Sequence, residues 1–141
     1  MPDTAHDLAE ALRPPLYRLY RLLRREGEGL GVSGLQFLLL AIIGKNPGIG
    51  TAELARMERL RGPTISGHVR TMEAAGLLTR SAGEHEDKRR VGLSVTAKGQ
   101  AVIDEMQRRR VDWLARRIGH LSEAERTALA AAIAPLARLS E

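Results

Sequence analysis

The spacing of apolar residues changes twice along this chain, and that change limits the fold more than any other feature. Over residues 4–26, leucines recur at the three- and four-residue steps of one helical face: Leu8, Leu12, Leu16, Leu19 and Leu23. Residues 77–80 and 91–95 instead have the pattern of β-strands and flank a charged loop over residues 82–90. Helical spacing then returns. We therefore predict a mostly α chain, of the α+β class, with one two-stranded hairpin.

Polar residues with a preference for helix N-termini predict where the other helices begin. Ser33 with Gln36 forms a capping box, in which each side chain satisfies a free amide at the start of a helix. A second capping box at residues 122–125 predicts the start of the last helix. Single N-caps are predicted at Thr51 and Thr96.

Prolines modify these predicted helices. Pro14 and Pro15 interrupt the first helix, because a proline inside a helix removes a backbone donor and clashes with the preceding turn. A kink, or a fresh start at Pro14, is therefore expected. Pro63 suits the first turn of a helix that Gly76 ends. Pro135 is expected to bend the last helix.

The residue types that are missing exclude several classes of protein. None of the 141 residues is Cys, which rules out disulfides, thiolate metal sites and a thiol nucleophile. The longest apolar run, residues 37–43, is far shorter than a bilayer span, and the polar N-terminal segment lacks the apolar core of a signal peptide. We therefore expect a cytoplasmic protein with no membrane partner.

No enzymatic or metal chemistry is predicted from the remaining residues. The chain has neither a G-x-S-x-G elbow nor any pair of histidines at metal-ligand spacing. The four histidines are scattered: His6, His68, His85 and His120. We expect no enzyme activity, no cofactor and no metal.

The predicted order of elements is that of a winged helix-turn-helix. A helix, a short helix, a turn and a further helix precede the hairpin. The short helix braces the next one, whose exposed N-terminal half fits a major groove, while the hairpin tip reaches the adjoining minor groove. Lys and Arg number 22 against 17 Asp and Glu, a net charge of +5, which is compatible with a polyanionic partner.

Five short motifs resemble, in order and spacing, the signatures of the MarR family, the multiple-antibiotic-resistance-type regulators. They are VSGLQF at 32–37, TAELA at 51–55, MEAAGL at 72–77, DKR at 87–89 and VTAKG at 95–99. The resemblance covers nearly the whole chain and implies a single domain over residues 1–141. About 33–98 would form the winged-helix DNA-binding part, and about 4–26 and 99–140 would form long dimerisation helices.

The resemblance also implies a function. It predicts a homodimer that binds double-stranded DNA at a near-palindromic operator, usually as a repressor. A small effector, phenolic or otherwise aromatic, would bind between the dimerisation and DNA-binding parts and release the operator. The aromatic candidates for that effector site are Tyr17, Tyr20 and Phe37.

Carried over residue by residue, the resemblance places the DNA contacts on two segments. The fourth helix would be the recognition helix, with outward positions Pro63, Thr64, Ser66, Gly67, His68, Arg70 and Thr71. In the hairpin loop, the aspartate-x-arginine pair of the family falls on Asp87 and Arg89, and Lys88 and Arg90 would contact phosphates. Gly67 and His68 depart from the family pattern, and His68 is either a base contact or a half-buried, hydrogen-bonded packing residue.

Two further interpretations belong beside this one. The arginines at 108–110 and 116–117 are predicted to form solvated faces or ion pairs at a dimer edge, because successive residues point around a helix. The alternative function is a winged-helix module for protein-protein contact that binds no nucleic acid. A gel-shift assay with genomic fragments separates the two functions.

Overall fold

The computed structural model describes residues 3–82 and 91–141. Over these residues the chain forms α1 (Ala5–Arg25), α2 (Gly34–Lys45), α3 (Thr51–Glu58), α4 (Gly62–Ala74), β1 (Leu78–Ala82), β2 (Val91–Val95), α5 (Ala97–Ile118) and α6 (Glu123–Leu139). The mostly helical fold with one hairpin is therefore confirmed. Within the described ranges, no helix combines the length and apolar character needed to cross a membrane.

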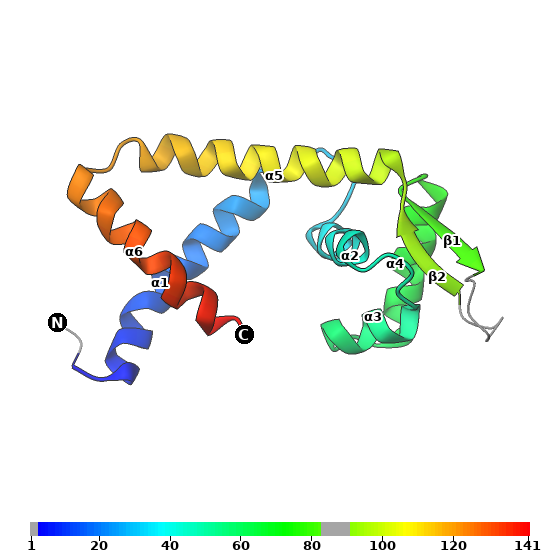
Figure 1. Ribbon diagram of the computed structural model, residues 1–141, viewed down its shortest axis with the longest axis horizontal. Helices are drawn as coiled ribbons and strands as arrows, with labels where there is room; N and C mark the ends of the chain where they lie inside the picture. The colour runs from blue at the N-terminus through cyan, green and yellow to red at the C-terminus, as the bar shows by residue number, and fades with distance from the viewer. Residues whose placement is uncertain (1–2, 83–90) are drawn as a thin grey trace.

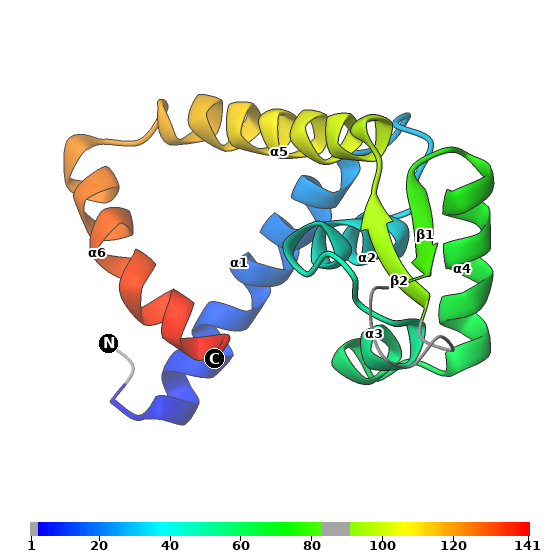
Figure 2. The same cartoon turned by 45° about the vertical axis from the view of Figure 1, so that its right-hand side comes forward.

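The long helix α5 connects two parts of different character (Figure 1). At its N-terminal end, α2, α3, α4 and the hairpin pack into one compact unit. Further along, α1 ends against the middle of α5, and α6 folds back from the far end of α5 toward α1 (Figure 2). The same arrangement is visible in both views.

The contiguous buried core of the described residues lies in the compact unit and the adjoining half of α5, and Trp113 is buried separately, farther along α5. Its fully enclosed side chains come from α2, α3, α4, β2 and α5: Leu39, Leu40, Ile43, Leu54, Ile65, Val69, Met72, Leu93 and Met106. By contrast, α1 and α6 contain no buried residue. The apolar faces that the sequence predicts for these two helices are therefore exposed in the single chain.

The hairpin is antiparallel, with Leu78 paired to Val95 at its base. A third short segment widens it, because Gly48 donates from its amide to the Leu93 carbonyl and the Leu93 amide donates to the Ile49 carbonyl, each at 2.8 Å. The strands are thus anchored to the loop before α3, which positions the hairpin beside α4.

Most predicted helix starts agree with the structure. The side chains of Ser33, Thr96 and Ser122 accept hydrogen bonds from amides in the first turns of α2, α5 and α6, and the first and last form complete capping boxes. The prediction for Thr51 is wrong, because Gly50 is the N-cap of α3 and makes no side-chain cap, while Thr51 is the first helical residue.

The fresh helix start expected at Pro14 does not occur, because α1 continues through Pro14 and Pro15. The carbonyls that lose their helical partners, four residues earlier, belong to Glu10 and Ala11, both exposed. Water can satisfy them there, which removes much of the cost of the two prolines. Pro135 likewise lies inside α6, and the helix does not stop at it.

Candidate nucleic-acid interface

Helix α4 presents its N-terminal end to solvent. Its N-cap is Arg61, which makes no side-chain cap, and Pro63 lies in the first turn as predicted. The amides of that turn are consequently left for water or a ligand, and the positive end of the helix dipole favours a phosphate there.

One face of α4 is buried and the other carries the predicted DNA contacts. Ile65, Val69 and Met72 enter the core. Among the predicted contact residues, the exposed ones are Pro63, Thr64, Arg70 and Thr71, and the half-buried ones are Ser66, Gly67 and His68. The core face accounts for Ser66 and His68, which flank it on either side, whereas Gly67 lies on the opposite side of the helix.

Thr71 and Gly67, two of the predicted DNA contacts, differ in what they offer to DNA. The Thr71 hydroxyl donates to the Gly67 carbonyl at 3.0 Å, so its oxygen is left to act as an acceptor. A Cβ atom added at Gly67 would meet no atom within 4 Å. Nothing inside the protein therefore requires glycine at position 67.

His68 is a half-buried residue with a hydrogen bond to a neighbouring helix. Its Nδ1 lies 3.3 Å from Nε2 of Gln36 in α2. The sequence singled out Gln36 only as the second member of a capping box, and this contact across 32 positions was missed. A single sequence carries no signal for it.

The C-terminal end of α4 is fixed to the start of α5. Gly76 adopts a left-handed conformation (φ 78°), and the amide of Leu77 donates to the Met72 carbonyl in a Schellman motif. The carbonyls of Ala75 and Gly76 accept from the start of α5: Lys98 Nζ donates to Ala75 O at 2.9 Å, and the hydroxyl of the N-cap Thr96 donates to Gly76 O at 2.6 Å.

The approach of α5 to this turn is close enough to require glycine at position 99. A Cβ atom there would overlap the Leu77 carbonyl oxygen. The joint between α4 and α5 therefore consists of packed backbone, one charge-assisted hydrogen bond from Lys98 and one neutral hydrogen bond from Thr96, and it couples the direction of the two helices.

The four predicted wing residues, Asp87, Lys88, Arg89 and Arg90, lie outside the described residues. The strands on either side of them pair in register up to Ala82 and Val91.

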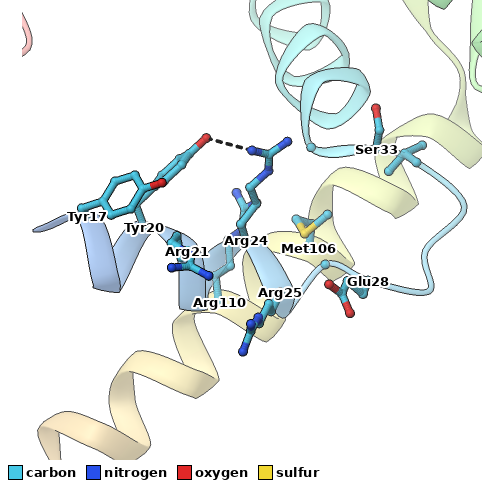
Figure 3. A pocket seen from close by; sticks show the side chains of 12 residues that line it. Tyr17, Tyr20, Arg21, Arg24, Arg25, Glu28, Ser33, Met106 and Arg110 are labelled. Atoms are coloured by element: carbon cyan, nitrogen blue, oxygen red, sulfur yellow. Dashed lines mark hydrogen bonds between the residues drawn. The ribbon is translucent and has the colours of Figure 1, made fainter.

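A hollow of about 390 Å³ lies between α1, the loop that follows it and α5 (Figure 3). Tyr17 and Tyr20, two of the three predicted effector residues, line it. The third, Phe37, does not line it, because Phe37 is buried beneath the guanidinium of Arg110, which lies 4.6 Å from the centre of its ring. The hollow also contains four arginines, at positions 21, 24, 25 and 110.

One of these arginines, Arg24, lies at the start of α2. The guanidinium of Arg24 occupies the space where a side chain at Gly34 would lie, at the N-terminal end of that helix. Arg24 also reaches toward the Tyr20 hydroxyl, at 3.5 Å (Figure 3). The N-terminus of α2 carries partial positive charge, so this helix end and the Arg24 guanidinium lie on the same side of the hollow.

The prediction of a solvated face is correct for Arg108 and wrong for Arg110. Arg108 is exposed and pairs with Glu105 and Asp112 on its own helix. Arg110 is half-buried and donates from Nε to the Leu23 carbonyl at the end of α1, at 3.3 Å. Burial lowers the pKa of Arg110 below its ordinary value. Arg110 is half-buried because the C-terminal end of α1 packs against this part of α5, a tertiary contact that the local sequence pattern does not predict.

A short bracing helix, an exposed helix after it and a two-stranded hairpin define a winged helix-turn-helix, the architecture of a large class of DNA-binding regulators. Comparison with known proteins narrows the class. Residues 32–91 match the profile of the MarR family. A curated relative, an uncharacterised HTH-type transcriptional regulator of Mycobacterium bovis, is 30% identical over 132 residues, covering 94% of this chain and 92% of the relative. The chain belongs to the MarR family of DNA-binding transcriptional regulators, whose members are not enzymes.

Solved structures agree with this assignment. The crystal structure of a transcriptional regulator protein from Pseudomonas aeruginosa is 32% identical, covers 98% of each chain and superposes with a TM-score of 0.82. A mutant of MepR from Staphylococcus aureus, solved bound to an oligodeoxyribonucleotide, is 18% identical, with a TM-score of 0.71 over 95% of this chain and 98% of that one. The second similarity establishes the fold alone.

Proposed function

We propose that this protein is a homodimeric repressor that binds a near-palindromic operator in the cytoplasm and is released by a small aromatic effector. Residues 33–98 would contact DNA, and residues 4–26 and 99–140 would form the dimer. The observation that carries the proposal is the division of the exposed surface: α4 exposes a polar face, whereas α1 and α6 expose apolar ones.

The apolar residues of α1 and α6 support the dimer. Ile133 and Leu139 are 68% and 73% exposed, and an apolar hollow of about 460 Å³ lies between Leu139 and the leucines of α1. Exposed apolar surface of this extent is normally an interface, and a second copy of the same surface is its simplest partner.

Sedimentation tests the dimer. Wild-type protein should sediment as a dimer at micromolar concentration, and Ile133→Asp should shift it toward monomer. Met57→Asp is the matched control, because Met57 is also an exposed apolar residue, at 52%, but lies on α3. A wild-type monomer, or equal effects of the two substitutions, would contradict the dimer proposal.

The two-fold symmetry of a dimer supports a near-palindromic operator, with half-sites about one helical turn, roughly 34 Å, apart. A gel-shift selection from genomic fragments should yield such a site, and footprinting should protect both half-sites.

Binding to the selected operator should weaken by tenfold or more between about 50 and 200 mM salt, because each phosphate contact releases counterions. Absence of any retarded fragment would favour the protein-protein alternative.

The aromatic and basic lining of the hollow near Tyr17 and Tyr20 supports an effector with an aromatic ring and an acidic group. The ring would stack on the tyrosines, and Arg24 with the start of α2 would attract the acid. Benzoate should release the operator at lower concentration than the isosteric neutral amide, benzamide.

Repression itself is tested by reporter expression from the selected operator with and without the protein.

A further inference from the structure

We propose that Gln36 presents His68 to DNA as a hydrogen-bond donor, and that this donor contributes to the choice of operator sequence. The inference rests on the proposed binding of DNA by α4. It states which ring nitrogen of His68 carries the proton and donates to DNA. Gln36 does not itself contact DNA in this scheme and is a positioning residue.

The first step concerns the orientation of the Gln36 amide. In the capping box of α2, the backbone amide of Ser33 donates to Gln36 Oε1 at 3.1 Å, and the Gln36 amide donates to Ser33 Oγ at 3.1 Å. A backbone N–H can be accepted only by the oxygen of the side-chain amide. The capping box therefore determines which end of the Gln36 side chain is turned away from Ser33, and that end is the NH₂ group.

The second step concerns the tautomer of His68 in α4, which the Gln36 NH₂ group determines. Gln36 Nε2 lies 3.3 Å from His68 Nδ1. Because the NH₂ group has only protons to offer, Nδ1 must accept, and in the neutral imidazole the single ring proton must then be on Nε2. The tautomer of His68 is thus set by a capping residue 32 positions earlier in the chain.

The third step places the resulting donor on the surface of α4. Among the described residues, every fully buried side-chain nitrogen or oxygen has a hydrogen-bond partner, whereas His68 Nε2 has none. Nε2 is therefore at least partly accessible from the surface. His68 is flanked on its own side of the helix by Thr64 and Thr71, four residues before and three residues after it, and both are exposed.

The donor distinguishes between the chemical groups that DNA offers. In the major groove, guanine, adenine and thymine present acceptors, whereas cytosine presents the N4 amino donor. The phosphate oxygens are also acceptors. A fixed Nε2–H donor favours an acceptor in either place, but only a base contact makes the preference depend on sequence.

The tautomer is tested by nitrogen-15 NMR of the histidine side chains in the full-length protein, at about pH 8, where imidazole is normally neutral. The His68 signals are assigned by their loss in His68→Ala. In wild type we expect the proton on Nε2 and an unprotonated Nδ1. In Gln36→Glu, the carboxylate still accepts from Ser33 but cannot donate, so Nδ1 should become protonated. A wild-type ring protonated on Nδ1, or an unchanged ring in Gln36→Glu, would overturn the assignment.

The contribution to DNA binding is tested by selecting bound sequences from a random library with the same proteins. His68→Ala should lose roughly three- to tenfold in affinity for the wild-type operator, the usual effect of one hydrogen bond. Loss of preference at one position in each half-site is the expected result and identifies a base acceptor, whereas an equal loss on all sequences identifies a phosphate contact and would overturn the role in sequence choice. Gln36→Glu should change the preference at the same position. Unchanged affinity and preference in His68→Ala would refute the donor role.

Gln107→Glu is the matched control for the added charge, because it makes the same chemical change at an exposed position of α5. It should leave the His68 tautomer and the base preference as in wild type, and circular dichroism should show that all variants are folded. If wild-type protein selects no DNA, the proposed function fails together with the donor role, while the NMR result still reports whether Gln36 sets the tautomer.

Discussion

Arg110 of α5 lies with its guanidinium 4.6 Å from the centre of the Phe37 ring in α2. The same side chain donates to the Leu23 carbonyl at the end of α1. One residue of α5 therefore joins this helix to both α1 and α2, which lie much earlier in the chain. This junction is also part of the wall of the proposed effector hollow, so it links the hollow to the base of the DNA-binding part.

Arg110→Ala should lower the free energy of unfolding by about 1–2 kcal/mol, because it removes a partly desolvated cation-π contact and a charge-assisted hydrogen bond. Arg108→Ala is the control and should change it by no more than about 0.5 kcal/mol, since its ion pairs are exposed. Urea titrations followed by circular dichroism measure both. Similar losses in the two variants would show that the Arg110 junction adds no stability.

Gly99→Ala should destabilise the protein by about 1–3 kcal/mol, the usual cost of overpacking. The added methyl group would overlap the Leu77 carbonyl oxygen, a backbone atom that cannot move without opening the joint between α4 and α5. Operator binding should weaken as well, because α4 would be displaced. Thermal unfolding together with a gel shift checks both effects, and a fully stable variant would show that the joint is not tight.

Gly67→Ala should have the opposite effect on stability. Gly67 lies inside α4, where alanine is favoured over glycine by about 0.5–1 kcal/mol, and the new methyl group would meet open space. If the backbone of α4 approaches DNA at this position, the same variant should bind the operator more weakly while unfolding at higher temperature. A gain in both properties would show that the DNA does not come close to Gly67.

The ion pairs of Glu105 with Arg108 and Arg109 on α5 predict that the free energy of unfolding depends on pH in the acid range. Hydrogen bonds from Arg108, and then from Arg109, lower the pKa of Glu105 below its ordinary value. The folded state therefore binds the Glu105 proton less readily than the unfolded state. The stabilisation is present above the ordinary pKa of glutamate and is lost as the pH falls through the lower pKa of the folded state. Glu105→Gln should flatten that part of the curve of unfolding free energy against pH, and identical curves would contradict this prediction.

Arg89→Ala should cost about 1–3 kcal/mol of operator binding if this arginine enters the minor groove as its motif implies. Asp87→Ala should cost less, and the double variant should bind about as weakly as Arg89→Ala alone, because the aspartate would then have nothing to orient. Lys88→Ala serves as the comparison within the same loop. Small, equal and additive losses in fluorescence anisotropy titrations would indicate a solvated loop.

The amino-acid sequence by itself determined the order of the elements and most of their ends. Apolar spacing and the caps at Ser33, Thr96 and Ser122 act over three or four residues, so a local pattern is sufficient to predict them. The family was evident from short motifs for the same reason. Of the two alternatives that local reasoning left at Pro14, a kink or a fresh start, the fresh start is wrong, because exposure of the preceding turn allows the helix to continue.

Only the tertiary structure decided which of these residues meet. Gln36 and His68 are 32 positions apart, and Leu23 and Arg110 are 87 positions apart. Whether such side chains touch depends on the angle at which two helices pack and on the rotation of each about its axis, and helical spacing leaves both undefined. The contact between His68 and Gln36, the partial burial of Arg110 and the position of Phe37 outside the hollow all follow from that packing, which no single segment of the chain specifies.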